Sequence, residues 1–209
     1  MAVGLGLVFL GAWSWLIRRG GEVEETIMAL DSSEPEVRRD LLEDLGAGGP
    51  VHKSVMGAIV KACSDGDPRV RKAAVHAVAR LDASRGEFLD AVMSGSRDSD
   101  PAVRMWAAVG LGEYHVRRKE GVQALVILLR RDRDERVRSS AARALGGFGE
   151  CAENAVGDLL EVAREGDPGL RIACAIAIGK IAPGRLPKDM EADAIEALPM
   201  EGALQAPGR

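Results

Sequence analysis

Apolar side chains recur at three- and four-residue intervals through most of the chain, which is the spacing of helices that bury one face. Valine, alanine and leucine follow this spacing over residues 70–81. A second stretch of the same kind precedes it at residues 55–60, and residues 122–129 repeat the pattern. These alternations predict pairs of amphipathic helices, with residues 23–30 as the first helix of the first pair.

A short motif, an acidic residue followed by proline, any residue, valine and arginine, recurs with small changes five times. The copies are residues 34–38, 67–71, 100–104, 134–138 and 167–171, and their acidic residues lie 33 or 34 positions apart. Aspartate caps free amides at a helix N-terminus, and proline at the first helical position loses no hydrogen bond. Each motif therefore predicts the start of the second helix of a pair.

Most copies end in an apolar residue followed by glycine, which we interpret as a C-terminal helix stop. The pairs are Leu45-Gly46, Leu111-Gly112, Leu145-Gly146 and Ile178-Gly179, whereas copy two has Ala79 at the glycine position. A single helix pair cannot bury its apolar stripe alone, so the copies are expected to stack on one another.

Four of these stretches, DPRVRKAAVHAVARL, DPAVRMWAAVGLGEY, DERVRSSAARALGGFG and DPGLRIACAIAIGKI, resemble HEAT repeats of the short HEAT-like or phycobilisome-lyase type. The resemblance spans residues 22–183 and implies an all-α, right-handed α-solenoid of about five helical pairs. It also implies that the second helices line the concave face. Repeated acids and arginines would form a ladder between copies: Asp67, Arg71, Asp100, Arg104, Asp134, Arg138, Asp167 and Arg171.

The residues beside the buried stripe of each second helix are the candidate partner-binding residues. Copies two and four place mainly basic side chains there, and copies three and five apolar ones: Arg69, Lys72, His76, Met105, Val109, Arg136, Arg143, Ile172 and Ile176. This combination suits a protein segment with hydrophobic anchors and acidic flanks. The alternative is that the apolar ones pack on neighbouring helices or on the C-terminal tail. Trp106 is interpreted as core packing rather than a binding anchor, because it lies in the apolar stripe.

The first 17 residues, Met1–Ile17, carry no charged side chain, and Arg18 and Arg19 follow them. As a helix this segment would reach about 25 Å, at the short end of what crosses a bilayer core. The arginines follow the apolar run, so the positive-inside rule predicts a single span with the N-terminus outside and the repeats in the cytoplasm. The expected organisation is a transmembrane anchor with its basic stop at 1–19, a hinge at 20–21, a repeat domain at 22–182, and a capping segment with a loose tail at 183–209.

Composition excludes several other classes. A formal charge of -4 and 3% aromatic residues argue against a general nucleic-acid binder. The three cysteines form no paired motif and are expected to be small buried residues. No nucleophile or phosphate-loop motif occurs, and the Asp-x-Asp pairs read as turns rather than calcium ligands. We therefore expect no catalytic residues, no metal and no cofactor.

The sequence predicts a membrane-anchored scaffold or accessory subunit that binds a protein partner, in or at the membrane, through the concave face. Membrane lipid would contact Met1–Ile17. Two other functions stay open at this point. One is a lyase-type or chromophore-handling subunit, and the other is a HEAT-like nucleic-acid module that uses Trp106 and the arginines of copies two and four.

Overall fold

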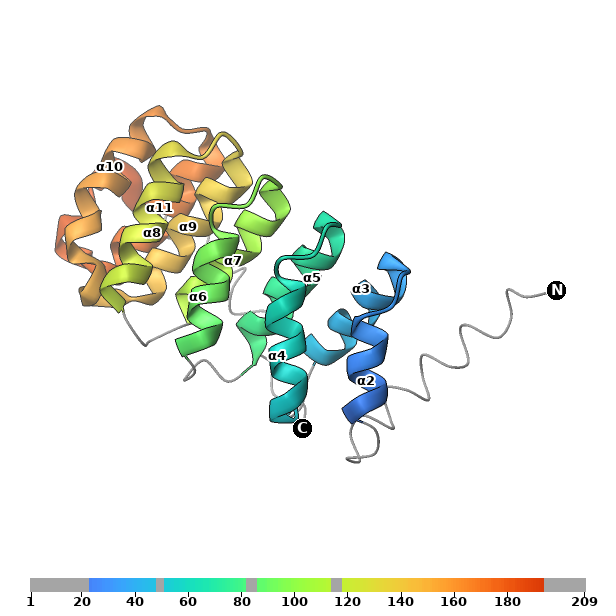
Figure 1. Cartoon of the computed structure of the whole chain (residues 1–209). Helices are drawn as coiled ribbons and strands as arrows, with labels where there is room; N and C mark the ends of the chain where they lie inside the picture. Colours follow the sequence, from blue (N-terminus) through green and yellow to red (C-terminus); the bar gives the residue numbers. More distant parts are fainter. Residues whose placement is uncertain (1–22, 48–50, 82–85, 114–117, 194–209) are drawn as a thin grey trace, which may run out of the picture.

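The computed structural model describes residues 23–47, 51–81, 86–113 and 118–193, and these residues are helical without any strand (Figure 1). The helices are α2 (Val23–Leu30), α3 (Pro35–Gly46), α4 (Lys53–Ala62), α5 (Pro68–Arg80), α6 (Gly86–Gly95), α7 (Pro101–Glu113), α8 (Arg118–Arg131), α9 (Glu135–Gly147), η1 (Gly149–Ala155), α10 (Val156–Glu165), α11 (Pro168–Ile181) and η2 (Pro183–Arg185). A further helical stretch covers residues 188–193.

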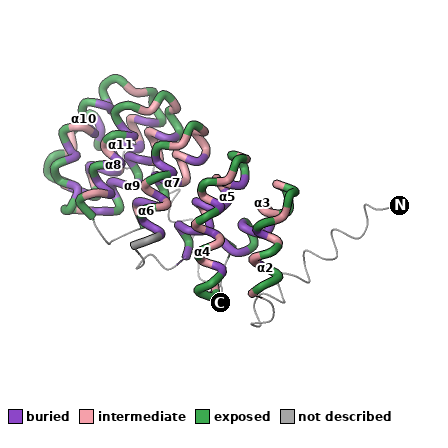
Figure 2. Tube along the Cα trace, in the orientation of Figure 1, coloured by how far each residue is buried: buried purple, intermediate pink, exposed green. Residues whose placement is uncertain are grey.

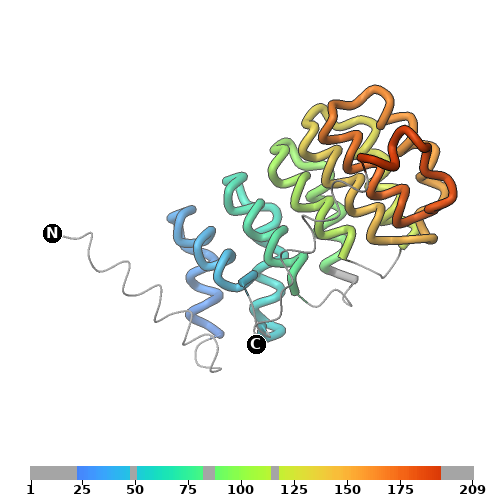
Figure 3. The backbone as a smooth tube through the Cα atoms, turned by 180° about the vertical axis from the view of Figure 1, so that it is seen from behind, coloured from blue at the N-terminus to red at the C-terminus, as the bar shows by residue number. Residues whose placement is uncertain are grey.

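The helices form five consecutive pairs, α2/α3 to α10/α11, and the pairs stack along the chain (Figures 1 and 3). Each second helix packs on the next one, from α3 through α5, α7 and α9 to α11. The first helices form a separate layer in which neighbours touch much less. The predicted all-helical solenoid of five pairs is confirmed.

No helix in the described ranges is long and apolar enough to cross a membrane. The predicted anchor and hinge, residues 1–21, lie outside those ranges, as does the tail beyond residue 193.

The aspartates of the repeated motif begin the second helices, as the motif predicts. Asp67 accepts a hydrogen bond from the backbone amide of Arg69 at 2.8 Å, and Asp134 does the same for Arg136 at 2.9 Å. Asp100 and Asp167 bind the amides of Ala102 and Leu170, both at 2.7 Å. These bonds satisfy amides that the helix itself leaves free.

Small side chains fill the core between the two layers, where buried residues follow one another along every second helix (Figure 2). In α5, for example, Val70, Ala73, Ala74, Ala77 and Val78 are all at most 1% exposed. A thin core built from alanine and valine needs few aromatic rings, which agrees with the composition. Of the three cysteines only Cys174 is fully buried; Cys151 is exposed, so the expectation of three buried thiols was wrong for it.

The glycines near the helix ends do not act as the predicted stops. Gly46, Gly112 and Gly146 remain inside or at the last residue of their helices, and Gly149 is the one glycine with positive φ that the described residues contain. Each of the three instead faces an alanine of the next second helix. A Cβ would lie 3.0 Å from Ala77 Cα at Gly46, 3.0 Å from Ala144 Cβ at Gly112, and 3.1 Å from Ala177 Cα at Gly146.

The contact between α5 and α7 uses the same two residue types in the opposite order. Ala79 stands at the glycine position of copy two, and Gly110 faces it from α7, where a Cβ would lie 2.9 Å from Ala79 Cβ. Gly179, in the last copy, has no atom within 4 Å of such a Cβ. Each contact between neighbouring second helices therefore includes one close approach of a glycine to an alanine. The second helices contact one another more extensively than the first helices do.

The stretch 188–193 covers the end of the last pair. Met190 is 4% exposed and belongs to the core. Arg171 donates from Nε to Asp193 Oδ2 at 2.7 Å and from Nη2 to the backbone oxygen of Asp189 at 3.0 Å. The described part of the expected capping segment thus closes the core behind α11.

Candidate functional site

Arginines of the repeated motif connect neighbouring copies. Arg71 donates from Nε and Nη2 to the two carboxylate oxygens of Asp98, at 2.7 and 2.8 Å, and from Nη1 to the backbone oxygen of Asp65 at 2.9 Å. Arg38 binds Asp65 and Arg104 binds Asp132 by the same two-pronged geometry. Such planar pairs hold two elements in a fixed relation.

The carboxylates of this ladder lie two residues before the ones the sequence predicted. Asp67, Asp100, Asp134 and Asp167 cap their own helices, so their oxygens are held locally. The ladder uses Asp65, Asp98 and Asp132, each of which also accepts the backbone amide of the cap residue, at 2.8 to 2.9 Å. In each Asp-x-Asp pair the first aspartate therefore belongs to the ladder, and the second caps the helix that follows. Both aspartates of each pair recur at intervals of 33 or 34 residues, so their spacing carried no signal that could have identified the ladder residue.

The ladder changes at the last two copies. Copy five has Glu165 where copies two to four have the ladder aspartate, and Arg138 Nε donates to the backbone oxygen of Leu129 at 3.0 Å. Arg171, the last motif arginine, binds Asp189 and Asp193 of the C-terminal stretch. The ladder is a structural device.

We call the solvent-facing side of α5, α7, α9 and α11 the inner face. None of the nine predicted partner-binding residues is fully buried, and they fall on these four successive helices. Arg69, Val109, Arg136 and Arg143 are exposed, and the others are half-buried: Lys72, His76, Met105, Ile172 and Ile176. Met105 also packs against the core, so for this residue the packing alternative holds as well.

A hollow of about 410 Å³ opens between α5 and α7. The rings of His76 and Trp106 form one wall, with centroids 4.0 Å apart and a tilt of 38°. Arg80, Val109 and Glu113 lie around it. Trp106 packs partly on the core but keeps accessible surface, so it is both a packing residue and part of this hollow. Burial, and then the charge of Arg80, lower the pKa of His76, which keeps its ring neutral at pH 7.

The cations on the inner face differ in how far they are neutralised. Arg69 binds Asp67 and Glu36, and Arg136 binds Asp134. Within the described residues, Lys72 and Arg143 have no ion pair, and Arg80 donates to the backbone oxygen of Gly46 at 2.8 Å. Arg80 was missed by the sequence prediction, although it follows His76 by four residues on the same face.

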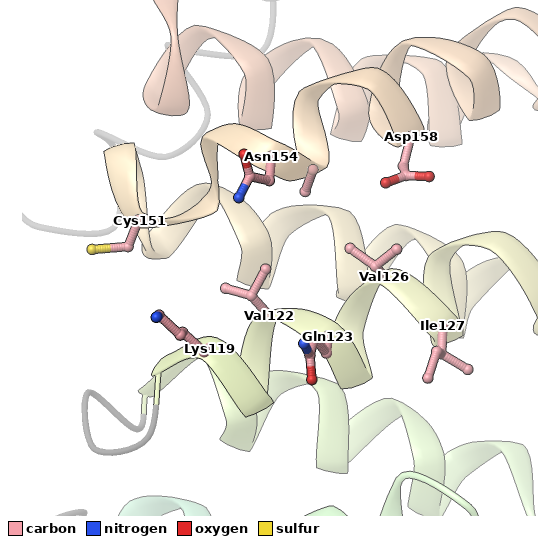
Figure 4. Close-up of a pocket in the computed structure, with 9 residues that line it drawn as sticks. Lys119, Val122, Gln123, Val126, Ile127, Cys151, Asn154 and Asp158 are labelled. Atoms are coloured by element: carbon pink, nitrogen blue, oxygen red, sulfur yellow. The ribbon is translucent and has the colours of Figure 1, made fainter.

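A second hollow, of about 670 Å³, lies in the first-helix layer between α8 and the η1/α10 segment (Figure 4). Val122, Val126 and Ile127 give it an apolar side, with Lys119 and Cys151 at one end and Asp158 at the other. No group of three or more histidine, cysteine or carboxylate side chains that could hold a metal occurs in the described part of the chain.

Comparison with known protein families resolves the class of the fold. A family profile described as HEAT repeats matches residues 23–87, 84–146 and 122–199, which together cover most of the chain. The chain belongs to the HEAT-repeat family. No curated protein matches this HEAT-repeat protein.

Three of the solved structures that share this fold are an engineered protein and two designed armadillo repeat proteins. An engineered protein superposes with a TM-score of 0.59 at 22% identity, covering 85% of each chain. A designed armadillo repeat protein superposes with a TM-score of 0.57 at 18% identity, over 88% of this chain and 93% of that one. A second designed armadillo repeat protein, in complex with the peptide (KR)4, superposes with a TM-score of 0.57 at 19% identity, over 90% of this chain and 93% of that one. These similarities show that this HEAT-repeat protein has an armadillo-like fold.

Proposed function

We propose that this HEAT-repeat protein is a membrane-anchored scaffold or accessory subunit, a binding protein rather than an enzyme, that holds a protein partner on its inner face. The observation that carries the proposal is the composition of that face, where Lys72 and Arg143, which form no ion pair in the described residues, occur together with accessible apolar side chains. Repeat solenoids commonly bind their partners on an extended concave surface. The designed armadillo complex with (KR)4 supports the proposal as an example of the same fold that carries a peptide.

Val109→Arg is expected to weaken partner binding by about tenfold or more. Val109 is 36% exposed at the centre of the inner face, and a buried arginine without a partner there would weaken an interface by about tenfold or more. The measurement is affinity capture of the full chain in nonionic detergent, followed by quantification of the captured protein. Ile127→Arg is the matched control, because Ile127 is 58% exposed but lies on α8 in the other layer. Loss of the partner with Ile127→Arg and not with Val109→Arg would contradict the proposal.

The membrane part of the proposal rests on the uncharged run Met1–Ile17 and the arginines that follow it. The full chain should stay with the membrane pellet after extraction with alkaline carbonate, which releases proteins that only dock on membrane proteins. Leu7→Arg combined with Leu10→Arg places two charges within the span and should move the chain to the supernatant. Recovery of the unmodified chain in the supernatant would refute the anchor and leave the proposed binding face untouched.

A further inference from the structure

Ile127 is an unusual residue for its position in the layer of first helices. It lies on α8 and is 58% exposed. The equivalent residues of α4, α6 and α10, at intervals of 33 or 34 positions, are Lys61, Ser94 and Glu161, which are all exposed and polar. In α2 the equivalent residue is Met28. Because a helix position that faces water normally carries a polar side chain, the isoleucine calls for a separate explanation.

Ile127 lies in a depression that runs along α8. The hollow of about 670 Å³ lies where α8 and α10 pack on each other much less than α9 and α11 do. Val122 and Val126 are on the side of α8 that faces η1 and α10 (Figure 4). Another hollow, of about 600 Å³, continues it along α8, and Val126 and Ile127 line both. We call these two hollows together the outer groove; its floor is apolar.

The charges that line the outer groove are mostly positive. Asp158 is already neutralised by Arg130, whose Nη1 donates to Asp158 Oδ1 at 2.6 Å. Lys119 at one end and Arg131 at the other are exposed, and within the described residues they form no ion pair. The lining therefore contains three cations and one carboxylate. A ligand with carboxylates at its two ends complements this distribution.

The length of the outer groove matches about three turns of a helix. Lys119 and Arg131 belong to the same helix and are 12 residues apart, which corresponds to about 18 Å along its axis. In a second helix, residues i, i+4, i+7 and i+11 lie along one face. Such a face presents two carboxylates about 17 Å apart with two apolar side chains between them. An amphipathic helix of this kind is a common ligand of apolar grooves.

We propose that the outer groove binds an amphipathic helix of a partner protein. Two apolar side chains of this helix pack against Val122, Val126 and Ile127. Its carboxylates lie near Lys119 at one end and Arg131 at the other. The outer groove is separate from the inner face, so the helix is a second protein segment in addition to the one that the proposed function places there. A protein held on the inner face stays bound when Ile127 is replaced.

The test uses a labelled sixteen-residue peptide with blocked ends, glutamates at its third and fourteenth positions, leucines at its seventh and tenth, and alanine or glutamine elsewhere. Fluorescence anisotropy follows its binding to the full chain in nonionic detergent. We expect it to bind at least about tenfold more tightly than two controls of equal length. One control moves the leucines to the fifth and twelfth positions, on the opposite face of the helix. The other has lysine in place of both glutamates.

Ile127→Glu should weaken binding of the peptide by about tenfold or more, because it places a carboxylate on the apolar floor against an acidic ligand. Met28→Glu is the matched control. It makes a similar change at the equivalent position of α2, where the methionine is 67% exposed, and it should leave the affinity unchanged. Unfolding temperatures of both variants are measured beside that of the parent.

Replacing Lys119 and Arg131 together by glutamate should weaken binding by about tenfold as well. The charge-matched control replaces Lys53 of α4 and Lys72 of α5, which lie outside the outer groove, and should have little effect. An equal loss in the two double variants would mean that only the overall charge matters and would overturn the charge pairing at the groove ends.

Equal binding of the peptide with shifted leucines would overturn the amphipathic helix, and tighter binding of the lysine peptide would overturn the charge. Unchanged affinity in Ile127→Glu, with an unfolding temperature close to that of the parent, would overturn the location. If sedimentation shows a dimer of the full chain that Ile127→Glu dissociates, a second copy fills the groove and the inference is wrong.

The outer groove and the proposed function can fail separately. If the peptide does not bind while Val109→Arg still weakens capture of a protein partner, the inference falls and the proposed function stands. If the peptide binds but capture does not depend on Val109, the proposed function fails and the outer groove stands.

Discussion

Gly110→Ala is expected to lower the free energy of unfolding by about 1–3 kcal/mol, the usual cost of forcing extra atoms into a packed contact. The new methyl group would lie 2.9 Å from Ala79 Cβ and 3.2 Å from Val92 Cγ1, closer than side-chain carbons approach without displacement. Chemical denaturation followed by circular dichroism at 222 nm measures the change.

Ala79→Gly in the same chain should recover part of this loss, because it removes the methyl group that the new one meets. The double-mutant cycle should give a favourable coupling of about 1 kcal/mol or more. Gly179→Ala is the control: it makes the same change in a helix where no atom lies within 4 Å, and it should stabilise by up to about 1 kcal/mol through helix propensity. If Gly110→Ala is as well tolerated as Gly179→Ala, the close-contact explanation is wrong.

Arg104→Met should destabilise the protein by about 2–3 kcal/mol at pH 7. Asp132 is 4% exposed on its side chain and Arg104 17%, so removing the guanidinium leaves a nearly buried carboxylate without its charge partner. The loss is measured as the change in the free energy of unfolding in urea. Arg136→Met removes an arginine that is 75% exposed and paired only with its own cap, and it should change stability little.

The same substitution should lose its effect in acid. Burial raises the pKa of Asp132, but the hydrogen bonds from Arg104 and from the cap amide outweigh it, and the pKa falls below its ordinary value. A carboxylate with a lowered pKa stabilises the folded state at pH above about 4 and loses this contribution as pH falls through the folded-state pKa. The difference between the parent and Arg104→Met should therefore shrink below about pH 4. A difference that stays constant from pH 7 to pH 2.5 would mean that Asp132 is not the group involved.

The sequence predicted the structure well where a residue type has a single role that depends only on its neighbours in the chain. Aspartate before proline predicts a helix start, and Asp67 and Asp167 form the bonds that this prediction requires. The 33-residue recurrence predicted the number of helix pairs for the same reason, because every copy repeats its own local signals.

Contacts between copies were predicted less well, because they depend on which faces meet. Two aspartates recur with the same period, and spacing alone could not show that Asp65 rather than Asp67 binds the arginine of the preceding copy. Gly112, which follows Leu111, looks like a helix stop. Glycine is instead required there because Ala144 of the next second helix leaves little room for a side chain. The contact between His76 and Trp106 likewise joins residues 30 positions apart and has no local signal.

The alternation of glycine and alanine also determines which copies can be neighbours. If copy two were duplicated in tandem, Ala79 would meet a second Ala77, and two methyl groups would compete for the space that now holds one. A duplicated copy four would instead bring Gly146 against Ala144 and preserve the pairing. These contacts determine which copies can follow one another. Gene duplication or engineering can therefore lengthen this solenoid by repeating copy four but not by repeating copy two.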